Sequence, residues 1–275
     1  MKTLNAAAVT RLFIILILTV HMAPGVRSGN SGSKVIMADY PNSIDDEFEG
    51  CKDEMFNLVK QLLNTELTSN ENFKAAWNKF RHGRFFGKKL DSTLTRKDLG
   101  IIAIQAYTGS PIYRELNDKM REGRGTYLTG FGLISLHFLI TDGIQTRNAD
   151  QYPQSGCRTT YRRTDITIEI TGPSVRFGSF ASSSFFSTLT HFGTETCFII
   201  TTCYGADISA ISKFAEGEGE VLIPPYEVFK SERVTAKPPE LSDCNRVYKL
   251  SSKRDDSKHK KSKMKCDYVN KDKMG

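Results

Sequence analysis

Residues 166–170 read Ile166-Thr-Ile-Glu-Ile170, and this stretch marks the point at which the chain changes its periodicity. Isoleucines alternate with polar residues there, and a period of two is typical of a strand that buries one face. Further strand-like runs follow at 174–180 and 196–203, until Pro224-Pro225 interrupts the last apolar run. The second half of the chain is therefore predicted to be mostly strand.

Before residue 150 the apolar residues recur at the helical spacing of three and four. Thr68 with Glu71 matches a capping box that would open the second helix, and Ser110-Pro111 would open the fourth. Helices followed by strands predict an α+β fold, with a helical subdomain at 43–150 and a β core at 151–266. The predicted helices lie around residues 55–63, 71–80, 99–107, 111–120 and 133–140.

The first 28 residues have the organisation of a signal peptide. Lys2 and Arg11 precede or open the apolar run that ends at Met22, and small residues follow up to Ser28. This run is too short for a membrane anchor, which needs about 18 apolar residues or more. No hydrophobic tail follows Cys266, as a lipid-anchor signal would require. We therefore expect a secreted, extracellular protein without a transmembrane span, in which residues 29–42 form an irregular arm.

All six cysteines lie beyond the signal peptide, and none forms a Cys-x-x-Cys pair. In a secreted chain they predict disulfide bonds, and the sequence alone does not choose among the possible pairings. The histidines are scattered along the chain, so no metal site is expected.

The net charge is +7, and the excess of bases is concentrated near the C-terminus. Ten lysines and arginines lie between Lys249 and Lys273, so residues 246–275 are expected to form a basic tail. No aromatic residue is interleaved in its lysine-rich part, 258–265, which argues against nucleic acid as a partner. A solvated tail is the simpler interpretation, and contact with an anionic cell surface is the alternative.

The segment Glu216-Gly-Glu-Gly-Glu220-Val-Leu-Ile-Pro-Pro225 is the most informative one for chemistry. On an extended chain Glu218 and Glu220 point to the same face, so they can present two carboxylates to one substrate. Such a pair suits a reaction through an oxocarbenium-like sugar cation, because one carboxylate stabilises the cation and the other orients a cationic acceptor. Taken alone, Glu-x-Glu is a weak signal, and a charged solvent face of an edge strand is the more common origin of such a pattern. No P-loop, Gly-x-Ser-x-Gly motif or Rossmann turn accompanies it.

With its flanks, this segment resembles the vertebrate ecto-ADP-ribosyltransferases, which are arginine-specific mono-ADP-ribosyltransferases of the R-S-E motif class. The resemblance implies an ADP-ribosyltransferase-like fold, in which N-terminal helices pack on a mostly antiparallel, two-sheet β core. It also implies NAD as the co-substrate, with no permanently bound cofactor, and protein arginines as acceptors. The similar segments follow the family's order over about residues 40 to 266: 43–51, 113–117, 136–139, Cys157 with Tyr161-Arg162, 175–184, 202–206 and 218–225.

The resemblance implies a catalytic set of Arg162, Ser182 and Glu220. Arg162 would hold the NAD pyrophosphate, because its fork of donors fits phosphate oxygens. Ser182 would position NAD and the carboxylate, while Glu220 would hold the ribose 2′-hydroxyl and stabilise the oxocarbenium ion. Glu218 resembles the acidic residue that receives the acceptor guanidinium and favours arginine. The implied NAD-binding residues are Tyr161, Arg162, Arg176 and Ser182.

The chain departs from the family at Arg163, where the family usually has glycine. A bulky side chain at this position is expected to crowd the phosphate site or to alter the turn. For the cysteines, the resemblance implies one bond between Cys51 and Cys266 and another between Cys157 and Cys203. It leaves Cys197 and Cys244, which either pair with each other or include a free thiol.

The predicted function is that of a secreted NAD(+)--protein-arginine ADP-ribosyltransferase, which releases nicotinamide. One alternative is an NAD glycohydrolase, in which water replaces the acceptor, and Glu218 argues against it. The other is a catalytically weak, secreted binding protein on the same fold. Arg163 and the basic tail favour this second alternative, and the complete set of predicted site residues opposes it.

Overall fold

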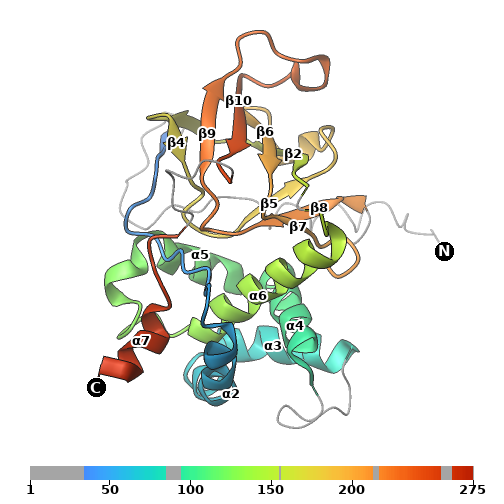
Figure 1. Ribbon diagram of the computed structural model, residues 1–275. Coiled ribbons are helices and arrows are strands. Elements are labelled where there is room, and N and C mark those ends of the chain that lie inside the picture. Colours follow the sequence, from blue (N-terminus) through green and yellow to red (C-terminus); the bar gives the residue numbers. More distant parts are fainter. Residues whose placement is uncertain (1–33, 85–93, 155, 213–216, 255–261, 275) are drawn as a thin grey trace, which may run out of the picture.

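The computed structural model describes residues 34–84, 94–154, 156–212, 217–254 and 262–274. Helices from the first half of the chain form one layer, and the strands of the second half lie against it (Figure 1). This arrangement confirms the α+β class that the change of periodicity predicts. The predicted signal peptide and residues 255–261 of the basic tail lie outside the described residues.

The helical layer is built around α6, which is buried at every residue from Ile134 to Asp142. A helix that is buried on all sides belongs to the centre of a core, and the other helices pack around it. A further helix, α7 (Asp267–Met274), lies near the C-terminus. The remaining bounds are Lys52–Ser69 for α2, Glu71–Arg84 for α3, Arg96–Gly109 for α4, Ile112–Glu122 for α5 and Ile134–Gln151 for α6.

The predicted capping box of the second helix is wrong. Thr68 lies inside α2, where its hydroxyl donates a hydrogen bond to the carbonyl of Asn64. The side chain of Asn70 caps α3 instead, because its oxygen accepts a 2.9 Å hydrogen bond from the backbone N–H of Phe73. One residue separates these two helices, so a pattern that spans the junction matches the motif without forming it.

Eight described strands form one mixed sheet in the order β4-β9-β10-β6-β2-β5-β8-β7. Its neighbouring strands are antiparallel except β10 and β6, which are parallel. The second sheet is the parallel pair of β1 (Lys34–Met37) and β3 (Thr167–Ile170). The large sheet comprises β2 (Arg158–Thr164), β4 (Ser174–Val175), β5 (Ala181–Ser184), β6 (Thr196–Thr202), β7 (Ala206–Asp207), β8 (Glu220–Ile223), β9 (Phe229–Arg233) and β10 (Arg246–Ser252).

Two strand predictions differ from the structure. The arm expected to be irregular contributes β1, because its backbone pairs with β3. The run 174–180 forms only the short strand β4, because the chain turns at Gly178. Gly178 has a φ of +71°, and a Cβ at this position would lie 2.7 Å from the ring of Tyr40. Only glycine fits both constraints.

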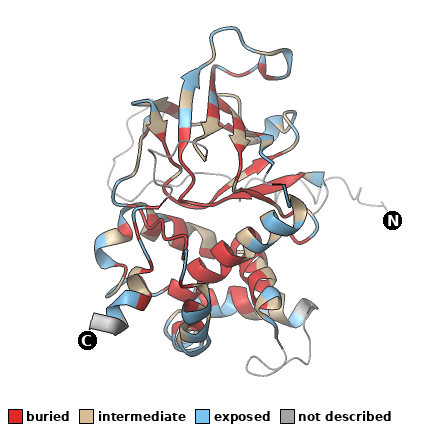
Figure 2. Cartoon of the chain, in the orientation of Figure 1, coloured by how far each residue is buried: buried red, intermediate tan, exposed pale blue. Residues whose placement is uncertain are grey.

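The end of the sheet formed by β5, β8 and β7 lies against the helices, and buried residues fill the space between the two layers (Figure 2). Phe180 and Leu222 from this end belong to the same buried cluster as α4 and α6. The last turns of α6 cover the edge strand β7, since the side chain of Gln151 donates a 2.7 Å hydrogen bond to the carbonyl of Asp207. The strands that carry the predicted site residues are thus held between the helices and the rest of the sheet.

Three disulfides link the described residues. Cys51 is bonded to Cys266 and Cys157 to Cys203, which are the pairs that the resemblance implies. Cys197 is bonded to Cys244, so the two cysteines left over by the sequence form a third bond. Among the described helices, none combines the length and the apolar character needed to cross a membrane.

Candidate active site

Arg162, Ser182 and Glu220 meet on three adjacent strands, β2, β5 and β8. The guanidinium of Arg162 donates a 2.5 Å hydrogen bond to the backbone carbonyl of Ser182. The hydroxyl of Ser182 in turn donates a 2.7 Å hydrogen bond to the carboxylate of Glu220. Strand pairing therefore brings together three residues that lie far apart in the sequence.

Glu220 is a buried carboxylate held by two hydroxyl groups. Its side chain accepts one hydrogen bond from Ser182 and another from the hydroxyl of Ser212. Burial raises the pKa of Glu220, while the bonds from Ser212 and Ser182 and the charge of Arg162 lower it in part. The role of Ser212 could not be predicted from the sequence, because this residue lies in a turn after β7 and belongs to no recognisable motif.

Glu218 lies beside Glu220, although the chain between them is not an extended strand. The strand β8 begins only at Glu220, and Gly219 adopts a φ of +52° in the turn before it. The alternation argument for the two carboxylates therefore fails in its geometry, yet both side chains line one cavity. Burial and the neighbouring charge of Glu220 raise the pKa of Glu218 to about 7.

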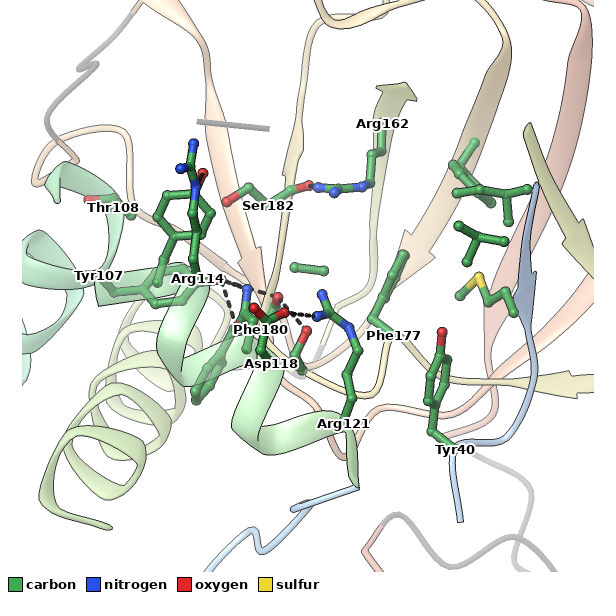
Figure 3. Close-up of a pocket in the computed structure, with 18 of the residues that line it drawn as sticks. Tyr40, Tyr107, Thr108, Arg114, Asp118, Arg121, Arg162, Phe177, Phe180 and Ser182 are labelled. Carbon is green, nitrogen blue, oxygen red and sulfur yellow. Dashed lines mark hydrogen bonds and ion pairs between the residues drawn. The ribbon is translucent and has the colours of Figure 1, made fainter. Parts of the chain in front are cut away.

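The larger of the cavities at this site has a volume of about 960 Å³, including its opening to solvent, and lies between the sheet and α5 (Figure 3). Arg162, Ser182 and Glu220 all line this cavity. Tyr40 and Phe177 also line it and supply apolar surface. A volume of this size, with arginines and apolar walls, suits a nucleotide.

The helix α5 contributes a stripe of polar side chains to the larger cavity. These side chains were not among the predicted site residues. Arg114, Asp118 and Arg121 all line the cavity. They are spaced by four and three residues and so lie on one face of the helix. Arg121 forms a 2.8 Å ion pair with Asp118. This spacing, in a segment that the resemblance already covers, is the signal that could have revealed them.

A smaller cavity of about 440 Å³ adjoins the same three residues. Arg162, Ser182 and Glu220 line both cavities, whereas Glu218 lines only the smaller one. Its opposite wall comes from the loop after β5, through Phe186, Leu189 and Phe192. Phe186 is 45% exposed, so part of its ring faces solvent at the mouth of this cavity. The smaller cavity therefore combines carboxylates with an aromatic wall open to solvent.

Two of the residues proposed to bind NAD lie outside the larger cavity. Tyr161 is half-buried and lines the smaller cavity beside Arg162. Arg176 lines neither cavity, because its guanidinium forms a buried ion pair with Asp45. Asp45 also accepts a 2.8 Å hydrogen bond from the backbone N–H of Lys263. Arg176 thus links the β core to the C-terminal segment, and its contact with NAD stays a prediction.

The side chain of Arg163 does not enter the expected phosphate site beside Arg162. Neighbouring residues of a strand point to opposite faces, so the two guanidinium groups diverge. The guanidinium of Arg163 binds Asp243 at 2.9 Å and the carbonyl of Ser187 at 2.6 Å. The expected crowding of the phosphate site is therefore absent, and β2 remains a regular strand through this position.

Comparison with known proteins agrees with this geometry. The sequence matches the family described as NAD:arginine ADP-ribosyltransferase over residues 37–255. It is 36% identical to T-cell ecto-ADP-ribosyltransferase 1 of Mus musculus over 238 residues, which cover 83% of this chain and 76% of that relative. It is 34% identical to the erythroblast NAD(P)(+)--arginine ADP-ribosyltransferase of Gallus gallus, with coverage of 79% and 74%.

The fold is similar to that of the eukaryotic mono-ADP-ribosyltransferase ART2.2, solved as a substituted form in complex with NADH. The two structures share a TM-score of 0.69 and 30% sequence identity, with coverage of 85% of this chain and 99% of ART2.2. A second substituted form of ART2.2 was solved in complex with NAD, with the same TM-score. On its sequence and its fold, the chain belongs to the NAD:arginine ADP-ribosyltransferase family.

Proposed function

We propose that this family member transfers ADP-ribose from NAD to arginine side chains and releases nicotinamide. The observation that carries the proposal is the position of Glu220, a buried carboxylate that lines both cavities and is held by Ser182 and Ser212. A carboxylate at this junction can act on a sugar carbon bound in one cavity while an acceptor approaches from the other.

The larger cavity is proposed to bind NAD. Arg114, Arg121 and Arg162 offer guanidinium forks that can bind the pyrophosphate oxygens in pairs. The solved complexes of ART2.2 with NADH and NAD support nucleotide binding by this fold. The bond broken is the glycosidic bond between the ribose C1′ and the nicotinamide nitrogen, and its electron pair leaves with nicotinamide.

Glu220 is proposed to stabilise the oxocarbenium ion that forms at C1′. Each carboxylate oxygen has two lone pairs, so Glu220 can accept a hydrogen bond from the ribose 2′-hydroxyl while it keeps those from Ser182 and Ser212. A negative charge that is already oriented and shielded from water stabilises a developing cation better than solvent does. The hydroxyl groups keep this charge in place before NAD binds.

Glu218 is proposed to receive the acceptor guanidinium in the smaller cavity. A guanidinium nitrogen attacks C1′, forms the new C–N bond and must lose one proton. Glu218, with its pKa raised to about 7, can take this proton near neutral pH. The aromatic wall at Phe186 offers a flat surface on which a guanidinium can stack.

We also propose that the protein acts outside the cell. Three disulfides among the described residues support an oxidising compartment, where such bonds persist. Three of the relatives carry the prefix ecto in their names. The signal peptide proposed for residues 1–28 would direct secretion, and the basic tail is proposed to contact anionic cell surfaces.

The test is transfer of labelled ADP-ribose from NAD to agmatine, a small guanidinium compound, by oxidatively folded protein. Wild type is expected to form ADP-ribosyl-agmatine, and Glu220→Gln is expected to lose about a hundredfold or more in rate, the effect of removing a main charge-stabilising group. A matched control is Glu232→Gln, which removes an exposed carboxylate of β9. Release of free ADP-ribose without any transfer would make the protein an NAD glycohydrolase, and a folded wild type that consumes no NAD would leave a binding protein.

A further inference from the structure

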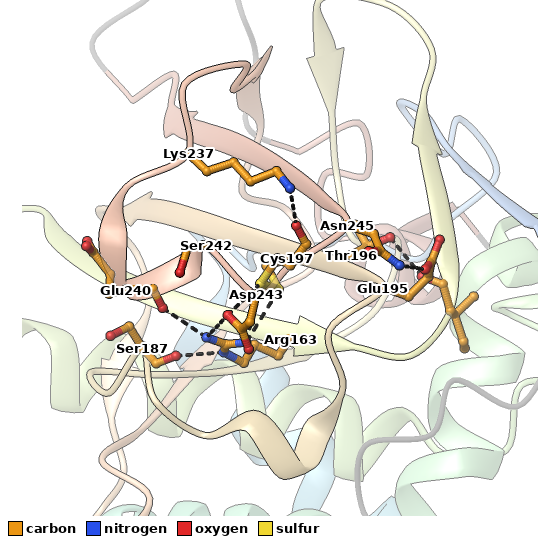
Figure 4. Close-up of a disulfide and its surroundings, with 12 residues drawn as sticks. Arg163, Ser187, Glu195, Thr196, Cys197, Lys237, Glu240, Ser242, Asp243 and Asn245 are labelled. Atoms are coloured by element: carbon orange, nitrogen blue, oxygen red, sulfur yellow. Dashed lines mark hydrogen bonds and ion pairs between the residues drawn. A yellow bond between two sulfur atoms is a disulfide. The ribbon is translucent and has the colours of Figure 1, made fainter.

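Arg163 is an arginine that the proposed chemistry does not use, although it follows Arg162 directly. Its side chain is buried, with a relative exposure of 4%. Burial of an arginine is costly unless its charge and its donors find partners. The partners of this one come from two separate segments of the chain, the loop after β5 and the stretch 240–243 (Figure 4).

The guanidinium of Arg163 joins β2 to these segments. Its Nε donates a 2.6 Å hydrogen bond to the carbonyl of Ser187, in the loop after β5. Its two terminal nitrogens bind the carboxylate of Asp243 at 2.9 and 3.1 Å, and one of them also donates to the carbonyl of Glu240 at 3.0 Å. The hydrogen bond from Arg163 also lowers the pKa of Asp243.

The third disulfide fixes the far side of this cluster. Cys244, next to Asp243, is bonded to Cys197 of β6, and both cysteines are buried. A terminal nitrogen of Arg163 lies 3.3 Å from the sulfur of Cys244. Asp243 is therefore held near the sheet. Because Arg163 binds both Asp243 and the carbonyl of Ser187, it also holds the backbone at Ser187 in place.

The loop held through Ser187 forms the aromatic wall of the smaller cavity. Phe186 precedes Ser187, and its ring would lie 3.0 Å from a Cβ placed on Gly219. The backbone N–H of Phe185 donates a 2.9 Å hydrogen bond to the carbonyl of Gly219. The loop thus contacts the turn that carries Glu218 on one side and Arg163 on the other.

We propose that Arg163 is a positioning residue for the acceptor half of the site. It holds the loop 185–193 so that Phe186 faces Glu218 across the smaller cavity, and it thereby favours capture of a guanidinium acceptor over water. The inference rests on the proposed function for the identity of the acceptor. Its core, the control of the loop by Arg163, rests on the contacts alone.

Lysine at this position offers the sharpest test. One ammonium group keeps the charge for Asp243, but it cannot reproduce the planar fork that binds Ser187, Glu240 and Asp243 together. Arg163→Lys is expected to raise the KM for agmatine at least about fivefold and to increase free ADP-ribose relative to transferred ADP-ribose, while the KM for NAD stays within about twofold. Arg233→Lys, which changes an exposed arginine of β9, is expected to match wild type in all three measurements.

A merely structural role would change the KM values for NAD and agmatine together, or lower the amount of active protein with unchanged KM values. Either result would overturn the proposal. If Arg163→Lys does not fold, Asp243→Asn replaces it, because Asp243 is partly exposed and its loss still weakens the orientation of Arg163. The same shift in the KM for agmatine is expected from this variant, with a smaller size.

Hydrogen exchange separates the failure of this inference from the failure of the proposed function. The amides of Phe185 and Phe186 are hydrogen-bonded in the loop, to Gly219 and to the hydroxyl of Ser184. Peptides that cover 184–193 are expected to exchange at least about tenfold faster in Arg163→Lys than in wild type. Unchanged exchange would refute control of the loop by Arg163, whereas faster exchange in a protein without transferase activity would refute only the identity of the acceptor.

Discussion

The hydroxyl of Ser182 donates a 2.7 Å hydrogen bond to the carboxylate of Glu220, and this contact joins β5 to the first residue of β8. The backbone carbonyl of the same serine accepts a hydrogen bond from Arg162. Ser182 is therefore the common neighbour of the two charged members of the set. Through its carbonyl and its hydroxyl, Ser182 links the arginine to the carboxylate.

Removal of the Ser182 hydroxyl is expected to lower the rate of transfer. A hydrogen bond to a charged group contributes about 1.5 to 3 kcal/mol, so Ser182→Ala should lower kcat by roughly ten- to a hundredfold. Loss of this bond also raises the pKa of Glu220 further, because the bond now lowers it. The comparison is Ser183→Ala, whose hydroxyl binds the carbonyl of Val221 instead of the carboxylate. Equal rates for the two variants would contradict this role of Ser182.

Transfer to agmatine is expected to depend on pH through Glu218. The pKa of this carboxyl is raised to about 7, and only its deprotonated form can accept a proton from the acceptor. Below pH 7 the value of kcat/KM for agmatine should therefore fall about tenfold for each pH unit, and above it a plateau is expected. Glu218→Gln should abolish this acidic limb and leave slow hydrolysis of NAD. An unchanged limb in the variant would assign the titration to another group.

The polar stripe on α5 is expected to contribute to the affinity for NAD. Substitutions in it should not change the affinity for the acceptor. Arg121 lines only the larger of the two cavities. Arg121→Ala should raise the KM for NAD by roughly tenfold, the effect of about 1.4 kcal/mol of lost binding, while the KM for agmatine stays constant. Arg233→Ala serves as the control for loss of an exposed arginine. A rise in the KM for agmatine alone would place the acceptor in the larger cavity.

Arg176 is expected to act on stability. Its loss leaves the buried carboxylate of Asp45 without its cationic partner, which typically costs about 3 to 5 kcal/mol. Arg176→Ala should lower the free energy of unfolding in urea by this amount, with the disulfides kept intact. Asp150→Asn, which breaks an exposed ion pair with Lys97, should cost less than about 1 kcal/mol. A normal stability combined with a raised KM for NAD would restore Arg176 to the NAD site.

The class of fold could be predicted from periodicity alone, because the change at residues 166–170 separates helices from strands. Local patterns were less informative about element ends. Thr68 and Glu71 matched a capping box, but Asn70 between them makes the cap. The order of the strands could not be predicted either, since pairings such as that of β10 with β6 join segments far apart in the sequence.

The residues of the candidate site could be predicted from the sequence only in part. The resemblance pointed to Arg162, Ser182 and Glu220, and the structure brings these three together. The resemblance did not point to Ser212, whose position depends on the turn after β7. The direction of Arg163 depends on the alternation of side chains along β2 and on the anchorage of Asp243 by a disulfide. Alternation is a property of any strand, whereas the positions of Ser212 and Asp243 depend on tertiary contacts that no local pattern of the sequence records.

The proposed function requires that the site joins ADP-ribose to a guanidinium in preference to other nucleophiles. The most direct test offers labelled NAD to wild type with equal concentrations of agmatine, a primary amine and a thiol, followed by mass spectrometry of the products. We expect ADP-ribosyl-agmatine as the main product, with nicotinamide released in equal amount. Label on the amine or the thiol, or free ADP-ribose as the sole product, would contradict it.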